Sequence, residues 1–466
     1  MENTTKNIMK TLLRLNKIRT ILAAATVTTL FLVGTNLASA LSGTYKFDLF
    51  PGSLNGGTSS GGYMAIDSAG SIIEDSLFAS YIVKYDKNGN FLWKTAATTA
   101  NYGRVVVDSA NNIYTDGYGG VFSNGNEYLT LSLEKISSAG AVLWSSNYII
   151  DLDNEQCSAG PMAIGNNGSI YAVVRGAPLS QPNAPFWIAR VNTSTGVMQK
   201  LVSVGRTGDY TYAMADTALA LDSNNNVFYG GLEGILSYSA DLSTLRWSNF
   251  STNPTNFPYS VRAIACDSAN NVYETGLSNA PLNSGVYTMI TKRRNNANGS
   301  VVWTSKNFVP NGGLAHYPQG NGGPDYYFGG NALAFDSSGN LYVVGAAQDS
   351  SGFIGGELAK YNPSSGAVLW TNEITYSDFD GTCTSVAVDN YVHVAGLNGT
   401  GPGANLGTIN VFNTSGTAQW STSISLSSSG ANLFTQVLED NVGGIWVIDN
   451  LLQVNASPII AKYTEQ

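Results

Sequence analysis

Three carboxylates stand at alternate positions in the segment Asp151-Leu152-Asp153-Asn154-Glu155. Oxygen ligands at this spacing open the calcium-binding loops of helix–loop–helix proteins. The segment lacks the glycine and the distal glutamate that complete such a loop, so solvated acidic side chains are the competing interpretation. The sequence therefore gives Asp151, Asp153 and Glu155 as a candidate Ca²⁺ site, and no other cofactor is expected.

A second group of chemically capable residues lies in the long segment 304–331, which is rich in aromatic residues and glycine. Aromatic planes beside hydrogen-bonding groups suit the recognition of a sugar or a protein surface. The same rings could instead be buried by the loop itself over a central channel. The candidate contact residues in this segment are His316, Tyr317, Asp325, Tyr326 and Tyr327.

Motifs of nucleophilic catalysis and phosphate binding are absent from the sequence. There is no Gly-x-Ser-x-Gly, no histidine pair at metal-ligand spacing and no glycine-rich phosphate loop. The two histidines, His316 and His393, fall in different repeats. His393 occupies the place of Tyr342 in its repeat, and we interpret it as a packing residue of a strand. The motif inventory favours a binding protein over an enzyme.

The elements that must position these residues are copies of one unit, seen most clearly in 332–370. Four short β-rich runs are separated there by turn-forming residues. The first half of the unit ends in a turn that begins with aspartate in all copies but one. The eight copies of this Asp turn begin at Asp67, Asp108, Gly165, Asp222, Asp267, Asp336, Asp389 and Asp440. The second half runs from a glycine to a tryptophan, and its seven copies end at Trp93, Trp144, Met198, Trp247, Trp303, Trp370 and Trp420.

The first half of the unit occurs eight times and the second half only seven times, and this difference predicts how the chain closes. The last copy stops at 461–463, where its fourth strand should begin, and 44–49 reads as a lone alternating strand ahead of the first copy. If these segments pair, the two ends share one sheet and leave no open edge. The sequence thus predicts an all-β fold, a single β-propeller of eight four-stranded blades closed by the N-terminal strand. Seven blades, with the third or eighth copy misread, is the alternative.

The strand order of a propeller places the Asp turns and the Gly turns on one face. Asp and Asn in such turns normally hydrogen-bond the local backbone, so these turns are expected to be structural rather than metal-binding. The remaining connections, which vary widely in length, fall on the opposite face. Loops on a rigid scaffold commonly carry binding residues, so this variable face is the predicted functional face.

Two arginines stand out near the axis of the predicted ring. Small residues precede most Asp turns, but Arg104 and Arg262 interrupt this series. Guanidinium groups at the mouth of the channel could hold a carboxylate or a phosphate of a ligand. An ion pair with a neighbouring acid is the competing interpretation.

The repeats resemble the quinoprotein-like propeller repeats and the related repeats of bacterial secreted propellers, most closely in 360–370 and 336–345. The resemblance implies the fold and a structural tryptophan packed between adjacent blades. Such repeats occur in enzymes, assembly factors and adhesins, so the resemblance selects no activity. Quinone-dependent dehydrogenases of this fold carry an adjacent pair of cysteines, whereas Cys157, Cys266 and Cys383 are far apart here.

Residues 1–40 have the pattern of a secretory signal, with five basic residues, an apolar core over 21–33 and a small-residue end at Ala38-Ser39-Ala40. An uncleaved anchor is the alternative. These residues hold five of the 23 basic and one of the 32 acidic residues, so 41–466, the predicted propeller domain, has a net charge of −13. That charge argues against nucleic acid as a partner, and no later segment could span a membrane.

The sequence therefore predicts a secreted, periplasmic or cell-surface propeller that is expected to be a monomer. Its predicted function is non-catalytic binding of a protein or a glycan through the variable face. The alternative is an enzyme, either a divergent quinoprotein-like oxidoreductase or a polysaccharide hydrolase or lyase.

Overall fold

The computed structural model describes residues 43–49, 63–76, 81–96, 104–123, 126–151, 157–176, 185–206, 218–231, 234–250, 259–278, 286–306, 315–316, 329–348, 354–374, 379–399, 405–424, 434–440, 443–449 and 459–465. All of them belong to the compact unit Leu41–Gln466. They form strands and turns, and no helix long and apolar enough to cross a membrane occurs among them.

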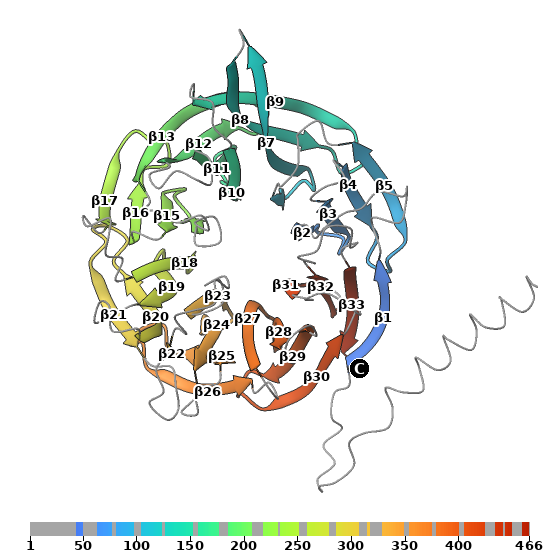
Figure 1. The fold of residues 1–466 in the computed structure, drawn as a ribbon, viewed down its shortest axis with the longest axis vertical. Coiled ribbons are helices and arrows are strands. Elements are labelled where there is room, and N and C mark those ends of the chain that lie inside the picture. The colour runs from blue at the N-terminus through green and yellow to red at the C-terminus, as the bar shows by residue number, and fades with distance from the viewer. Residues whose placement is uncertain are drawn as a thin grey trace, which may run out of the picture. The chain divides into compact units, whose positions relative to one another are not determined.

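Eight antiparallel four-stranded sheets follow one another around a ring (Figure 1). Blade A contains β2 (Tyr63–Ile66), β3 (Ile72–Ser76), β4 (Tyr81–Tyr85) and β5 (Phe91–Ala96). Blade B contains β6 (Val105–Val107), β7 (Ile113–Ser123), β8 (Asn126–Ile136) and β9 (Val142–Asp151). Blade C contains β10 (Cys157–Ile164), β11 (Ser169–Gly176), β12 (Pro185–Asn192) and β13 (Met198–Arg206). Blade D contains β14 (Ala218–Leu221), β15 (Val227–Gly231), β16 (Gly234–Tyr238) and β17 (Leu245–Phe250).

The second half of the ring repeats this order. Blade E contains β18 (Tyr259–Cys266), β19 (Val272–Ser278), β20 (Val286–Arg294) and β21 (Val301–Lys306), and the short β22 (Ala315–His316) pairs with β20. Blade F contains β23 (Gly329–Phe335), β24 (Leu341–Gln348), β25 (Ile354–Tyr361) and β26 (Val368–Ile374). Blade G contains β27 (Phe379–Val388), β28 (Tyr391–Gly399), β29 (Asn405–Asn413) and β30 (Ala418–Ile424). Blade H contains β31 (Phe434–Glu439), β32 (Gly444–Asp449), β33 (Ile459–Glu465) and β1 (Gly43–Leu49).

Blade H is shared by the two ends of the chain. Strand β1 runs antiparallel to β33, with Gly43 opposite Glu465 and Leu49 opposite Ile460. The innermost strand of blade H, β31, in turn contacts β2 of blade A. The prediction of eight blades closed by the N-terminal strand is therefore confirmed. The alternative of seven blades is wrong, because blades C and H are both complete sheets.

The core lies between neighbouring blades. One apolar cluster joins Tyr114, Leu131 and Leu133 of blade B to Met162 and Ile170 of blade C, and similar clusters occupy other blade boundaries. Middle strands such as β4 and β15 are buried along their whole length. This burial on both faces explains their nearly continuous apolar sequences.

The aspartate of each Asp turn is used within the turn. Asp336 Oδ1 accepts hydrogen bonds from the amides of Ser338 (3.0 Å) and Asn340 (2.8 Å), and its Oδ2 accepts from Asn340 Nδ2 (2.8 Å) and from the Tyr342 hydroxyl (3.0 Å). The turns that begin at Asp108 and Asp267 repeat this pattern. The prediction that these turns are structural is confirmed for these repeats.

The tryptophan of one blade packs on the Gly turn of the next. Trp370 Nε1 donates to the carbonyl of Thr414 (3.2 Å), and a Cβ added to Gly416 would lie 2.8 Å from Cδ2 of Trp370. Equivalent hydrogen bonds and close approaches occur at Trp93, Trp144, Trp247 and Trp303. The structural role that the family resemblance implied for tryptophan is thus confirmed.

The third repeat differs from this expectation. Lys200 pairs with Arg190 as Trp370 pairs with Lys360, so Lys200 stands in the tryptophan position of blade C. The assignment of Met198 to that position is wrong, because Met198 lies two residues before Lys200 and pairs with Val191 instead. Lys200 follows the turn glycine Gly196 by four residues, the same spacing that separates Trp370 from Gly366.

Candidate functional site

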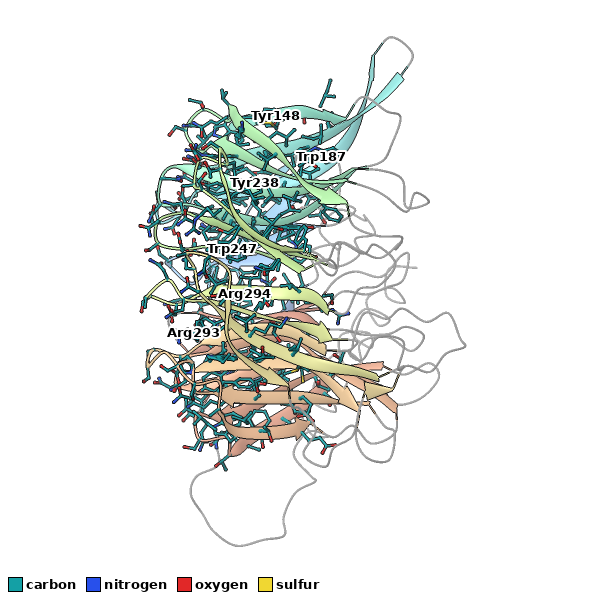
Figure 2. All side chains as sticks on the ribbon, turned by 90° about the vertical axis from the view of Figure 1, so that its left-hand side faces the viewer. Tyr148, Trp187, Tyr238, Trp247, Arg293 and Arg294 are labelled. Atoms are coloured by element: carbon teal, nitrogen blue, oxygen red, sulfur yellow. The ribbon has the colours of Figure 1, made fainter. Side chains whose placement is uncertain are left out.

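The two faces of the ring differ in how their connections are built. The turns between first and second strands span 67–71, 108–112 and 336–340, with equal length in all blades except G, where the turn is 389–391. On the opposite face, the connection between second and third strands ranges from Ser123–Asn126 in blade B to Asp449–Ile459 in blade H. The β7–β8 hairpin projects beyond the rest of the ring (Figures 1 and 2).

Several predicted site residues lie outside the described residues, namely Asp153, Glu155, Tyr317, Asp325, Tyr326 and Tyr327. The backbone of Asp151 ends β9 and lies opposite Leu129. The backbone of His316 in β22 lies opposite Val286, where β20 begins. This pairing holds His316 at the variable face, and the binding and metal roles of all these residues stay predictions.

Arg104 lies beside an aromatic ring and near an acid at the inner edge of blade B. Its guanidinium carbon is 3.8 Å from the centre of the Tyr63 ring of blade A, which is a cation–π contact. Its backbone amide donates to Asp116 Oδ1 (2.6 Å). Burial raises the pKa of Asp116 to about 7, although the hydrogen bond and the charge of Arg104 act in the opposite direction. The guanidinium of Arg104 thus packs on Tyr63 across the boundary between blades A and B, and its role in ligand binding stays a prediction.

Arg262 begins a chain of polar contacts along the innermost strands. It occupies a β-bulge in β18, and its guanidinium donates to Asn331 Oδ1 of β23 (3.0 Å). Asn331 Nδ2 donates in turn to Thr382 Oγ1 (3.1 Å) and to the carbonyl of Cys383 (2.8 Å) in β27. Bulges recur at equivalent positions of β10, β23, β27 and β31. In these five blades the first strand therefore carries a bulge shortly before the Asp turn.

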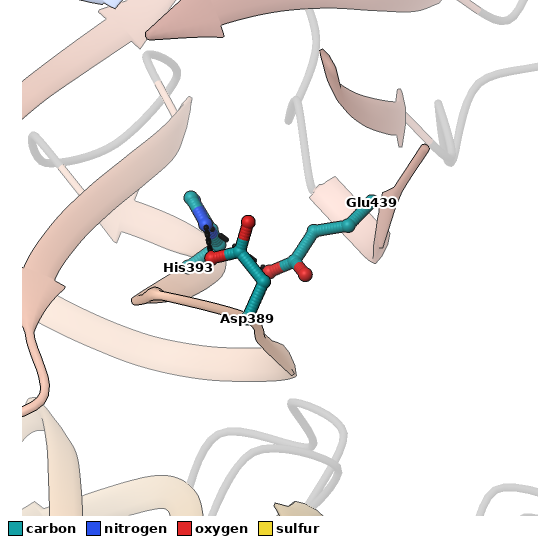
Figure 3. Close-up of side chains that lie close together, drawn as sticks. All are labelled: Asp389, His393 and Glu439. Carbon is teal, nitrogen blue, oxygen red and sulfur yellow. Dashed lines mark hydrogen bonds and ion pairs between the residues drawn. The ribbon is translucent and has the colours of Figure 1, made fainter. Parts of the chain in front are cut away.

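Among the described residues, Asp389, His393 and Glu439 form a cluster of potential metal ligands (Figure 3). His393 Nε2 is 3.2 Å from Asp389 Oδ1 and 3.1 Å from Glu439 Oε1. The imidazole is buried, whereas the Asp389 side chain is 38% exposed. Burial raises the pKa of Asp389, but the hydrogen bonds from His393 and the Tyr391 amide and the charge of His393 leave it below its ordinary value.

Sequence reasoning placed His393 correctly but missed its surroundings. His393 lies opposite Ala387 as Tyr342 lies opposite Ala334, so its predicted place in the repeat is confirmed. Its interpretation as a packing residue overlooked Glu439, which approaches from blade H. The available signal was that Glu439 stands where other repeats have an apolar residue before the turn.

A second group of acids is buried around blades A and B. Glu74 is fully buried, and no hydrogen bond reaches its carboxyl oxygens within the described part of the chain. Burial, with the nearby charge of Asp75, raises the pKa of Glu74 to about 8. The pKa of Asp75 is well above its usual value, mainly through burial, although the Thr115 hydroxyl donates to it. Because these side chains are enclosed, we interpret them as a pH-dependent structural element rather than a binding site.

We expect the free energy of unfolding to fall as pH rises from about 5 to 8. The unfolded state releases the Glu74 proton near its ordinary pKa of 4.5 and the folded state only near 8, so the folded state binds more protons within this window. The variant Glu74→Gln should flatten the dependence and raise stability at pH 8 by on the order of 1–3 kcal/mol. Urea unfolding at pH 5 and pH 8 measures this effect. An unchanged pH slope in the variant would contradict it.

Comparisons with known proteins agree on the fold. No family model matches the chain, and no curated protein sequence matches it. Among solved structures, the Dos1 propeller is similar with a TM-score of 0.55 and 8% identity, covering 92% of this chain and 97% of its own. The quinohemoprotein alcohol dehydrogenase ADHIIG of Pseudomonas putida HK5 follows with 0.50 and 12% (88% and 76% covered). A europium-containing methanol dehydrogenase gives 0.50 and 10% (93% and 95% covered).

This chain therefore has a quinoprotein-like propeller fold. At these identities the likeness concerns the fold alone. The adjacent cysteine pair that accompanies the quinone is not matched, since Cys157, Cys266 and Cys383 are far apart in the sequence and lie in β10, β18 and β27 of three different blades. By this criterion the chain's residues do not fit the quinone cofactor.

Proposed function

We propose that this chain is a non-catalytic propeller that acts at or outside the cell envelope and binds a protein or a glycan through its variable face. The observation that carries the proposal is the contrast between the two faces. Uniform turns with internally bonded side chains form one face, whereas connections of unequal length form the other. The rigid ring thus carries its connections of unequal length on one face, where binding residues are commonly found.

On the Asp-turn face, polar groups of the described turns are engaged in hydrogen bonds with one another. In blade D, Asp222 accepts hydrogen bonds from the amides of Asn224 and Asn226, from Asn226 Nδ2 and from Asn296 Nδ2. Neighbouring turns also bond one another, as Ser223 does through its amide to Asn270 Oδ1 (2.9 Å). A ligand at this face would have to break internal bonds, which opposes binding there.

The β7–β8 hairpin supports a protein partner. Strand β7 pairs with β6 only from Ile113 to Thr115. Farther along, from Gly117 to Ser123, the edge of β7 opposite to β8 has no paired strand among the described residues. An unpaired strand edge can accept an extended segment of another chain by adding a strand. The edge is long enough for several backbone hydrogen bonds beyond the ring.

The binding proposal is tested with two variants of the variable face. In one, an Asn-Gly turn replaces residues 120–129, because Gly119 lies opposite Thr130 and a two-residue turn closes that pair. In the other, Tyr326 and Tyr327 become Ala. A glycan array and a pull-down first identify ligands of the wild-type chain, and the affinity of each variant for them is then measured by biolayer interferometry.

We expect at least one of these variants to bind about tenfold more weakly, since truncating a central contact commonly costs more than 1 kcal/mol. The matched control is Ser364→Arg, which adds bulk and charge at an exposed position of a Gly turn on the other face. Its affinity should equal that of the wild type. Loss of binding in the control alone would mean that the functional face has been assigned to the wrong side of the ring.

A further inference from the structure

We propose that Asp389, His393 and Glu439 form a divalent-metal site, suited best to Zn²⁺, that joins blade G to blade H. The three side chains each bring one ligand atom to a common point, with all three atoms within 4.8 Å of one another. Three separate departures from the repeat create this arrangement, and they coincide at a single blade boundary. Each departure replaces a group that other repeats use for packing or for charge neutralisation.

The first departure is the histidine itself. In blades B, E and F the equivalent residue is a tyrosine whose hydroxyl donates to the turn aspartate, as Tyr342 does to Asp336 Oδ2 at 3.0 Å. Blade G has the shorter turn 389–391, and His393 takes the tyrosine's place. A phenol that donates a proton is thereby replaced by an imidazole that can offer a lone pair to a metal.

The second departure removes the resident cation. In blades A, F and H a lysine of the third strand lies at the turn carboxylate, for example Lys84 at 2.7 Å from Asp67 and Lys462 at 2.7 Å from Asp440. The equivalent residue of blade G is Val411, which lies opposite Trp420 as Lys360 lies opposite Trp370. Blade G therefore supplies no lysine to its turn aspartate from this position.

The third departure brings a second carboxylate. The residue before the turn is apolar in the other repeats, and in blade F it is Phe335, whose ring lies 5.1 Å from the Tyr273 ring of blade E. At the same contact between blades G and H, His393 meets Glu439. An apolar contact across a blade boundary has become a contact between two metal-binding groups. The site thus gains a negative charge where the repeat would place none.

The geometry suits a cation better than shared hydrogen bonds. Both carboxylate oxygens approach the same nitrogen, Nε2 of His393, at 3.1 and 3.2 Å, so a single N–H would have to serve both. Ligands bound tetrahedrally at about 2.0–2.1 Å are roughly 3.3 Å apart. The observed separations are close to that value. Small adjustments of the exposed Asp389 side chain would complete the coordination.

The donor set identifies the class of metal. An imidazole nitrogen with two carboxylate oxygens suits Zn²⁺ and related transition metals, whereas Ca²⁺ and Mg²⁺ prefer oxygen ligands only. Three protein ligands leave a fourth position for water, and the exposure of Asp389 gives access from solvent. A metal held here would fasten the blade that the two chain ends share to its neighbour.

In the test, metal is first removed from the protein with a chelator. Zn²⁺ binding is then measured by isothermal titration calorimetry, and the Zn²⁺ content after dialysis is measured by elemental analysis. We expect one Zn²⁺ per chain and a rise in Tm of roughly 2–5 °C at a hundredfold excess over Kd. Co²⁺ in place of Zn²⁺ should give the visible absorption bands of a tetrahedral site. A wild-type chain that retains no Zn²⁺ would overturn the proposal.

Two variants restore what other repeats use, so both should fold: His393→Tyr and Glu439→Val. Each should weaken Zn²⁺ binding at least tenfold and abolish the rise in Tm. The control His316→Ala removes the other histidine and should keep the full stoichiometry. Unchanged Zn²⁺ affinity in His393→Tyr, or its loss in His316→Ala, would place the metal elsewhere and refute the site.

Discussion

The variant Gly366→Ala is expected to lower the free energy of unfolding far more than Gly339→Ala. Both glycines have positive φ, 73° and 80° respectively, so an alanine at either position costs about 1–2 kcal/mol through backbone strain. Their surroundings differ. An added Cβ at Gly339 meets nothing within 4 Å, whereas at Gly366 it lies 2.5 Å from Cδ2 of Trp303.

The additional cost at Gly366 comes from the junction of blades E and F. Trp303 rests on the Gly turn, donates through Nε1 to the Pro363 carbonyl (2.9 Å) and stacks on Tyr361 at 6.3 Å between ring centres. A methyl group there would move the indole and weaken these contacts. We expect the difference between the two variants to be about 2–4 kcal/mol.

Urea unfolding followed by tryptophan fluorescence measures both variants under the same conditions. Gly339→Ala serves as the matched control for backbone strain, so the difference isolates the contact with Trp303. Equal destabilisation of the two variants would mean that the tryptophan contacts contribute little to holding adjacent blades together.

Most of the fold could be predicted from the sequence because each blade is encoded locally. The Asp turn and the Gly turn are each fixed by a few consecutive residues, so their recurrence reveals the strand order without knowledge of contacts between blades. The divergent third repeat also forms a blade, although Gly165 replaces its aspartate and Lys200 its tryptophan. Packing by the neighbouring blades compensates for these local losses.

The candidate site could be predicted only in part, because it depends on contacts between repeats. Asp389 and His393 are close in sequence, but Glu439 reaches them only through the stacking of blade H on blade G. The contacts of Arg104 with Tyr63 and of Arg262 with Asn331 likewise cross blade boundaries. A pattern within one repeat reports the turn and the strand, whereas these contacts depend on the angle between neighbouring sheets.

The second large effect is expected from removing β1. Six residue pairs join β1 to β33, from Gly43 opposite Glu465 to Leu49 opposite Ile460. An antiparallel ladder has about one hydrogen bond per residue pair, so at a net 0.5–1.5 kcal/mol for each bond their loss amounts to roughly 3–9 kcal/mol. The deletion would also expose the edge of β33, which favours association between chains.

The closure of the ring supports every assignment of residues to its two faces. The measurement that tests it most directly is the thermal unfolding of a chain lacking residues 1–50, compared with a chain lacking only 1–40. We predict that the shorter chain unfolds at a Tm lower by about 5 °C or more and forms oligomers in size-exclusion chromatography. Equal Tm values and a monomeric elution for both chains would contradict a blade shared by the two ends.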